Sequence, residues 1–245
     1  MAQVFIGTSG WTYPSWKGIF YPADLPSTRF LEFYRNQFPT TEVNYSFYHL
    51  PRPSTYEKWA AQVPEGIFAV KASRFITHTK RLKSVEEPWR IFLQHALSLG
   101  SRLGPILFQF PASFRCDHMR LAEFLTMART VGPGAERLRL VFEFRHGSWF
   151  EEKVYRLLSG YGVALCIADS PQYPRREITT ADFMYFRFHG RIRLFASSYT
   201  NADLAEEARK IRRFLYEGHD VYAYFNNDAE GSAVVNAQML TAMTE

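Results

Sequence analysis

Short apolar segments alternate with amphipathic segments along the whole chain. Strand-like runs occur near residues 3–8, 41–48, 67–73, 105–110, 138–145, 163–168, 183–189 and 220–226. Helical patterns lie between them, near 28–37, 54–62, 87–99, 118–130, 150–159, 202–217 and 232–243. The strand centres, such as Ile106-Leu107-Phe108 and Leu140-Val141-Phe142, are apolar on both faces. That pattern is typical of parallel strands covered by helices.

Eight strands with helices between them predict an α/β fold, a single TIM-type (β/α)8 barrel. The length of 245 residues fits the roughly 250 residues of one such barrel. An open doubly wound sheet is disfavoured, because Gly7-Thr8-Ser9-Gly10 is too short for a dinucleotide-binding turn. The segment 170–182 contains Pro171 and Pro174, so we expect a loop there and a sixth helix that is reduced or absent.

Four of the apolar segments end in polar residues two positions apart, namely Asn44 and Ser46, Lys71 and Ser73, Glu143 and Arg145, and Arg187 and His189. Side chains two apart on a strand share a face, and a TIM barrel builds its active site at the C-terminal ends of its strands. We therefore predict that one pocket at this rim, beneath Trp11 and Tyr13, is lined by Asn44, Lys71, Gln109, Glu143, Arg145, Asp169, Arg187, His189 and Asn227.

Arginine and histidine suggest the chemistry of this pocket. Arg145 and Arg187 offer forked donors to a phosphate or carboxylate. His189 would exchange a proton, because histidine titrates near neutrality, and Asp169 or Glu143 would set its charge. Two structural alternatives remain: an Arg–Glu network that only locks the strands together, and an Asp169 that clamps a neighbouring arginine.

The other predicted site residues have less specific roles. A lysine inside a barrel can be a base, a Schiff-base amine or a counter-ion, and a pair between Lys71 and the buried Glu42 is the favoured interpretation. Gln109 would orient a ligand or water, and Asn227 would complete the polar floor. Trp11 and Tyr13 would stack on a ring or merely plug the barrel. They belong to the segment 10–26, which, like 74–86, is a long connection expected to overhang the rim.

Composition narrows the class of protein. With 47% hydrophobic and 22% charged residues, the sequence is that of a globular protein. The net charge of +5 favours an anionic ligand without the strong basic signature of a dedicated nucleic-acid binder. No apolar run reaches the roughly 20 residues of a membrane helix, and nothing at the N-terminus resembles a signal peptide. We expect a cytoplasmic protein without a membrane partner.

The two cysteines, Cys116 and Cys166, have no CxxC spacing and no neighbouring His ligand set. We expect two reduced thiols. Glu143, Asp169 and His189 are mixed with cations that would repel a metal ion, so no metal and no cofactor are predicted.

Seven motifs together resemble one known family: Gly7-Thr8-Ser9-Gly10-Trp11, Asn44-Tyr45-Ser46-Phe47-Tyr48, Lys71 to Thr77-His78, Gln109-Phe110-Pro111, Glu143-Phe144-Arg145-His146, Arg187-Phe188-His189-Gly190 and Tyr224-Phe225-Asn226-Asn227. The chain resembles the domain-of-unknown-function family seventy-two, also called the YecE-like family. The resemblance implies one TIM-barrel domain over residues 1–245, in a bacterial or archaeal cytoplasm. It implies no reaction, since none is established for the family.

The leading hypothesis is an enzyme that performs acid–base chemistry on a small anionic substrate, of hydrolase, lyase or isomerase type. One alternative is a nucleic-acid binding or phosphodiester-processing protein, with basic residues in 74–83 and aromatic rings that stack on bases. Another is a protein that binds a metabolite without turnover. The oligomeric state is not predicted.

Overall fold

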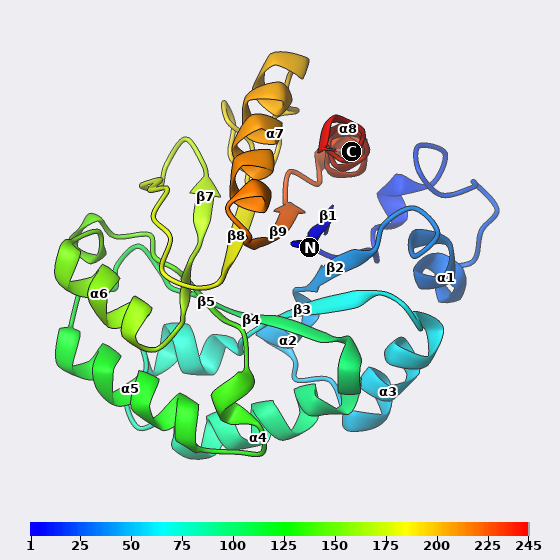
Figure 1. Cartoon of the computed structure of the whole chain (residues 1–245). Helices are drawn as coiled ribbons and strands as arrows, with labels where there is room; N and C mark the ends of the chain where they lie inside the picture. Colours follow the sequence, from blue (N-terminus) through cyan, green and yellow to red (C-terminus); the bar gives the residue numbers. More distant parts are fainter. Residues whose placement is uncertain (245) are drawn as a thin grey trace.

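Parallel strands form the centre of the computed structural model, which describes residues 1–244 (Figure 1). The strands are β1 (Val4–Thr8), β2 (Thr40–Val43), β3 (Ile67–Lys71), β4 (Leu103–Gln109), β5 (Leu140–Glu143), β6 (Ala164–Leu165), β7 (Ile167–Asp169), β8 (Phe183–Phe188) and β9 (Asp220–Phe225). They pair in the order β6-β5-β4-β3-β2-β1-β9-β8-β7. The two ends of this order, β6 and β7, are pieces of one strand interrupted at Cys166, whose N–H still donates to the Phe142 carbonyl at 2.9 Å. The sheet therefore closes into the predicted barrel of eight strands.

Helices surround the strands (Figure 1). They are α1 (Phe30–Tyr34), α2 (Tyr45–Tyr48), α3 (Pro53–Gln62), α4 (Glu86–Ala96), α5 (His118–Thr130), α6 (Glu152–Gly160), α7 (Asn201–Tyr216) and α8 (Ser232–Thr244). The segment 170–182 contains no helix, which confirms the prediction of a missing sixth helix. Among the described residues, no helix has both the length and the apolar character needed to cross a membrane.

The predicted strand over 41–48 is wrong in its second half. Strand β2 ends at Val43, and Asn44 adopts a helical backbone that leads into α2. Tyr45 and Tyr48 are exposed, three positions apart, whereas Ser46 and Phe47 are buried. That spacing is helical, and the Ser46 hydroxyl donates to the Val43 and Lys71 carbonyls instead of pointing to the rim.

Both long connections follow strands, after β1 and after β3. The segment 10–26 contains a 3-10 turn at Pro14–Trp16, and the segment 74–86 contains a π-helical turn at Phe75–Thr79. Strand β3 ends at Lys71, so Ser73 already belongs to the second connection, where its hydroxyl accepts the Phe75 N–H. Ser73 therefore does not share a strand face with Lys71, contrary to the prediction.

Two apolar layers hold the barrel together. The layer between strands and helices is rich in aromatic rings, such as Phe144 stacked on Trp149 with ring centres 4.4 Å apart. Each fully buried ring of this kind contributes about 1.5–3 kcal/mol of transfer free energy. The layer inside the barrel is small and contains Ala69, Leu107, Val141, Ala164, Cys166, Ala168, Phe183, Tyr185, Tyr222 and Tyr224. Polar side chains continue the same strand faces toward the C-terminal ends.

Candidate functional site

Strand alternation decides which polar side chains enter the barrel. Lys71, Gln109, Glu143 and Arg187 each stand two residues after a member of the inner layer, so they share its face. Glu42 follows Thr40 in the same way, and the Thr40 hydroxyl lies 2.7 Å from the Tyr224 hydroxyl inside the barrel. Five strands, β2, β3, β4, β5 and β8, therefore direct polar groups toward the inside of the barrel near their C-terminal ends.

Arg187 lies at the centre of these groups, with none of its surface exposed. Its Nε donates to Glu42 Oε2 at 3.0 Å and its Nη2 to Glu42 Oε1 at 2.8 Å, a bidentate pair. Its Nη1 donates to Glu143 Oε2 at 2.5 Å. Every nitrogen of the guanidinium is thus already bonded inside the protein, and Arg187 has no donor free for a ligand. These contacts correspond to the structural alternative considered from the sequence, an Arg–Glu network that holds the strands together.

The two carboxylates are buried as charges. Burial by itself would raise the pKa of Glu42, but Arg187 and the hydroxyls of Ser9 and Tyr185 outweigh it and hold that pKa below its ordinary value. Glu143 is held well below its ordinary pKa against the same burial, mainly by Arg145 and Arg187. The pair predicted between Glu42 and Lys71 does not form, because Arg187 occupies both oxygens of Glu42.

His189 is buried behind Arg187. Its Nε2 lies 3.6 Å from Glu143 Oε1, and its Nδ1 lies 3.1 Å from the Asn226 amide nitrogen. Burial lowers the pKa of His189 to about 4, and Arg187 and Arg145 add to the shift, so the imidazole is neutral at pH 7. His189 was expected to exchange a proton with the substrate. Its ring has no exposed surface, so a substrate at the rim would not contact it directly.

Lys71 and Arg145 are the cations that face outward from this floor. Among residues 1–244, the Lys71 ammonium has no ion pair and no hydrogen bond, and it lies 4.2 Å from the centre of the Phe47 ring. Burial lowers the pKa of Lys71 to about 7, with Arg187 adding to the shift and Glu42 and Glu143 opposing it. Lys71 remains partly exposed, so a ligand can reach it.

The guanidinium of Arg145 is hydrogen-bonded through its Nε edge, and its two terminal nitrogens lie on the other side. Its Nε donates to Glu143 Oε1 at 2.7 Å, and its guanidinium stacks over the Tyr173 ring at 4.3 Å. Neither terminal nitrogen has a hydrogen-bond partner among the described residues. Tyr173 belongs to the helix-free segment 170–182, which therefore covers part of the rim.

Asp169 and Asn227 were predicted to line this pocket, and their side chains point the other way. Asp169 follows Ala168 of the inner layer, so it faces outward, where it pairs with Arg175 at 2.8 Å. Arg175 also pairs with the buried Glu207 of α7 at 2.7 Å, so Asp169 is the arginine clamp that was considered as an alternative. Asn227 donates to the Ser197 carbonyl and to Asn236 of α8.

Residues with the correct alternation were overlooked in the sequence. Asn226, not Asn227, continues the inner face of β9 after Tyr222 and Tyr224. Tyr185 stands two residues before Arg187, and its hydroxyl donates to Glu42 Oε2 at 2.7 Å. Counting in steps of two from a known inward residue, back from Arg187 and forward from Tyr224, would have identified both.

Asn44 and Gln109 stand at the rim with unused polar capacity. The Asn44 amide nitrogen donates weakly to the Ser9 carbonyl at 3.4 Å, whereas its buried Oδ1 has no hydrogen-bond partner among the described residues. The Gln109 amide nitrogen donates to the Phe110 carbonyl at 2.7 Å.

A cavity of about 740 Å³ opens beside the ends of β1 and β2. Its lining includes Ser9, Trp11, Tyr13, Asn44, Tyr48 and Trp59. Trp11 is buried and packs edge-on against Trp59 at 5.1 Å, so it forms a wall of this cavity. The Tyr13 hydroxyl donates to the Ser9 carbonyl at 2.6 Å and lies 3.1 Å from Asp228 Oδ2.

Comparison with known proteins finds similarity over the whole barrel. A family model described as "Protein of unknown function DUF72" matches residues 5–245. The UPF0759 protein YunF of Bacillus subtilis is 25% identical over 276 residues, which cover 99% of this chain and 95% of that protein. The crystal structure of a DUF72 family protein (TM1631) from Thermotoga maritima aligns with a TM-score of 0.80 and 31% identity over 98% of both chains. A DUF72 family protein (EF0366) from Enterococcus faecalis aligns with a TM-score of 0.84 and 19% identity, covering 99% of this chain and 95% of that one.

Proposed function

The chain belongs to the DUF72 family of proteins of unknown function, as its motifs predicted, and we propose that it is an enzyme performing acid–base chemistry on a small anionic substrate at the C-terminal rim. One observation carries this proposal. The ammonium of Lys71 and the terminal nitrogens of Arg145 have no hydrogen-bond partner among the described residues, and they lie above a floor whose other charges are neutralised.

The charges of the site favour an anion. Glu42 and Glu143 balance Arg187 and Arg145, so a protonated Lys71 leaves one positive charge in excess. A bound phosphate or carboxylate would neutralise that charge and take hydrogen bonds from the terminal nitrogens of Arg145.

Lys71 is the group best suited to move a proton. A general acid or base works best when its pKa lies near the working pH, and the Lys71 pKa of about 7 meets that condition. Glu143, Arg187 and His189 would act indirectly by fixing Arg145 and the electric field at Lys71. Asn44 and Gln109 would orient the polar part of the substrate.

The aromatic cavity would accept the body of the substrate. Its volume of about 740 Å³ is in the range of small-molecule sites. Trp11 and Tyr13 line it, and Asn44 and Ser9 belong to both the cavity and the rim. We therefore favour an anion attached to a ring or another flat apolar group.

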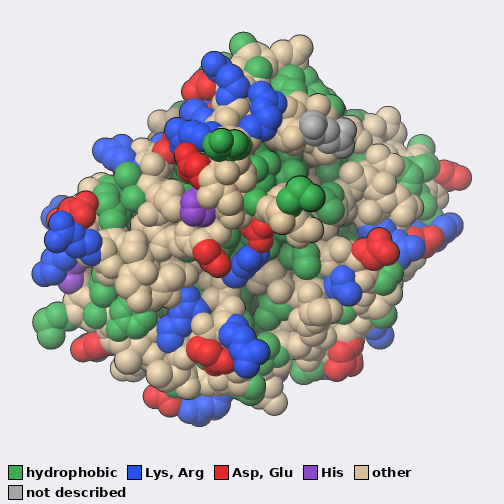
Figure 2. Space-filling view, in the orientation of Figure 1, with side chains coloured by type: hydrophobic (Ala, Val, Ile, Leu, Met, Phe, Trp, Pro, Cys, Tyr) green, Lys and Arg blue, Asp and Glu red, His purple; other side chains and the backbone are tan. Residues whose placement is uncertain are grey.

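A nucleic-acid partner is less well supported. On the face drawn in Figure 2, Lys and Arg side chains are interspersed with acidic ones and form no continuous band. A protein that follows a phosphate backbone needs such a band.

The experiment follows metabolites by mass spectrometry after a small-molecule extract is incubated with the protein. The wild type should convert at least one phosphate- or carboxylate-bearing compound, with an apparent pKa near 7 in its rate profile. Lys71→Met should reduce turnover by at least about 10²-fold, and Arg145→Met should weaken substrate binding. The control is Lys58→Met, at an exposed lysine of α3. Equal turnover by Lys71→Met and Lys58→Met would contradict the proposal, and tight binding without conversion would select the non-catalytic alternative.

A further inference from the structure

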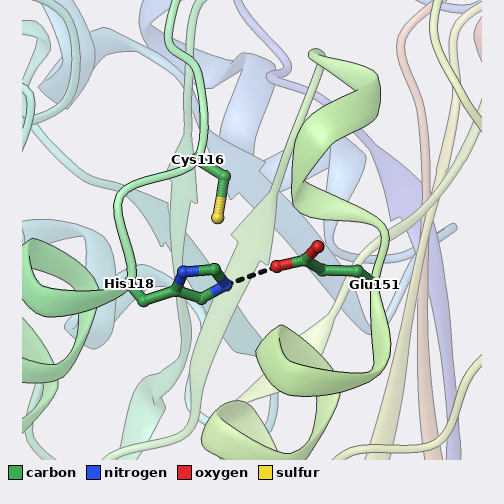
Figure 3. Close-up of side chains that lie close together, drawn as sticks. All are labelled: Cys116, His118 and Glu151. Carbon is green, nitrogen blue, oxygen red and sulfur yellow. Dashed lines mark hydrogen bonds and ion pairs between the residues drawn. The ribbon is translucent and has the colours of Figure 1, made fainter.

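We propose that Cys116, His118 and Glu151 form a zinc-binding site that fastens two connections at the C-terminal side of the barrel. Cys116 and His118 lie where the β4–α5 connection enters α5, and Glu151 lies at the start of α6. One donor atom from each residue lies within 4.8 Å of the others. Figure 3 shows the Cys116 thiol pointing toward the contact between the His118 ring and the Glu151 carboxylate.

Local structure holds these donors in place. Asp117, between the two ligands, caps α5 by accepting the Arg120 N–H at 3.0 Å, so its own carboxylate is engaged elsewhere. The Cys116 N–H donates to the Ser148 hydroxyl at 2.8 Å across the two connections. Glu151 is the N-cap residue of α6, yet its carboxylate accepts no N–H of that helix, which leaves it available as a ligand.

The donor set matches the chemistry of zinc. A thiolate sulfur, an imidazole nitrogen and a carboxylate oxygen together suit Zn²⁺ and disfavour Mg²⁺ and Ca²⁺, which prefer oxygen alone. With bonds of about 2.0–2.3 Å, a tetrahedral zinc would hold its donors roughly 3.3–3.6 Å apart. Small side-chain movements suffice, because the His118 and Glu151 side chains are 32% and 48% exposed and not packed in place. Water would take the fourth position, and the thiol would release its proton on binding.

A catalytic thiol is a weaker interpretation of the same residues. Burial raises the pKa of Cys116 to about 11, and Glu151 and Asp117 add to the shift, so the thiol is protonated and unreactive at neutral pH. Two carboxylates around a sulfur repel a thiolate anion but attract a divalent cation.

The site lies outside the acid–base site and does not depend on it. Its effect on the rim would be mechanical, because β4 carries Gln109 and β5 carries Glu143. No metal was predicted at Cys116, because the sequence around it shows no CxxC spacing and no set of neighbouring histidine ligands. Glu151 is 33 residues beyond His118 in the sequence. Folding brings the third donor into range.

The test is a titration of the reduced, chelator-treated full-length protein with Co²⁺, read as thiolate-to-cobalt charge-transfer absorption, followed by Zn²⁺ competition and elemental analysis. We expect one metal ion per chain, loss of the absorption in Cys116→Ser, and at least about a tenfold weaker affinity in Glu151→Gln. Cys166→Ala is the matched control, because Cys166 lies in the inner layer of the barrel, and it should bind like the wild type.

A second measurement tests whether zinc stabilises the two connections. Hydrogen exchange of residues 110–117 and 144–151 should slow on adding Zn²⁺ to the wild type and not to Cys116→Ser. Absence of stoichiometric binding, or binding and protection that survive in Cys116→Ser, would overturn the proposal. Neither result would affect the proposed acid–base chemistry, whose variants are at Lys71 and Arg145.

Discussion

Replacement of Arg187 by methionine tests the charge network beneath the rim without knowledge of the substrate. Methionine has a similar length and fills the apolar part of the space, but it removes the donors that serve Glu42 and Glu143. Glu143 keeps its bond from Arg145 at 2.7 Å. Among the described residues, Glu42 keeps the hydroxyls of Ser9 and Tyr185, at 2.6 and 2.7 Å, and no ion pair.

The expected loss is large because one buried charge is left unpaired. Removing one partner of a buried ion pair destabilises a protein by about 3–5 kcal/mol, a large part of a total stability of about 5–15 kcal/mol. The exposed pair of Arg29 with Glu32 provides the control, since Arg29→Met should leave the free energy of unfolding nearly unchanged.

The loss should also depend on pH. In the wild type the Glu42 pKa is lowered, so its contribution to stability is present above the unfolded pKa and disappears as the pH falls. Without Arg187, burial dominates and raises the folded pKa of Glu42 above the unfolded value, so the variant loses stability as the pH rises. The difference in unfolding free energy between wild type and Arg187→Met therefore grows from pH 5 to pH 8, by about 1.4 kcal/mol for each unit by which the folded Glu42 pKa of the variant exceeds 5.

Urea unfolding followed by circular dichroism at both pH values measures this difference. The double variant Glu42→Gln/Arg187→Met should recover part of the loss at pH 8, since it removes the unpaired charge. A loss below about 1 kcal/mol for Arg187→Met, or one that does not change with pH, would refute the reasoning from burial and pairing.

Two further predictions concern the first and last strands. Gly7→Ala should lower the unfolding free energy by about 1–3 kcal/mol, because an added Cβ would lie 2.1 Å from the Thr40 carbonyl oxygen. Gly147→Ala, where nothing lies within 4 Å, should change it by less than about 1 kcal/mol. Similar melting temperatures for the two variants would contradict the close β1–β2 contact. Burial raises the pKa of Asp228 to about 7, so the folded state binds a proton that the unfolded state releases, and stability falls as the pH rises through 7. Asp228→Asn, which still accepts the Tyr13 hydroxyl, should show less of this fall between pH 5 and pH 8 in urea unfolding, and an unchanged slope would count against a buried Asp228.

The sequence by itself determined the barrel and the inward side chains of its straight strands. Glu143 and Arg187 could be placed because an apolar run with a period of two has one inner face, and the same rule identifies Tyr185 and Asn226. The rule failed at Asn44–Tyr48, where a helical turn with exposed tyrosines has the same local composition as a strand end. The rule itself holds at Asp169, where the prediction was wrong: Ala164, Cys166 and Ala168 face inward in steps of two, so Asp169 faces outward.

Tertiary structure alone decided which charges pair. Lys71 and Arg187 are both cations on inward positions, and only the placement of β2 against β8 across the barrel shows that Arg187 takes both oxygens of Glu42. Pairing of long side chains depends on distances of a few ångströms between strands far apart in the sequence, which no local pattern contains. For that reason our proposal assigns anion binding to Lys71 and Arg145 and not to Arg187. The Cys116–His118–Glu151 cluster likewise becomes visible only when two connections lie side by side.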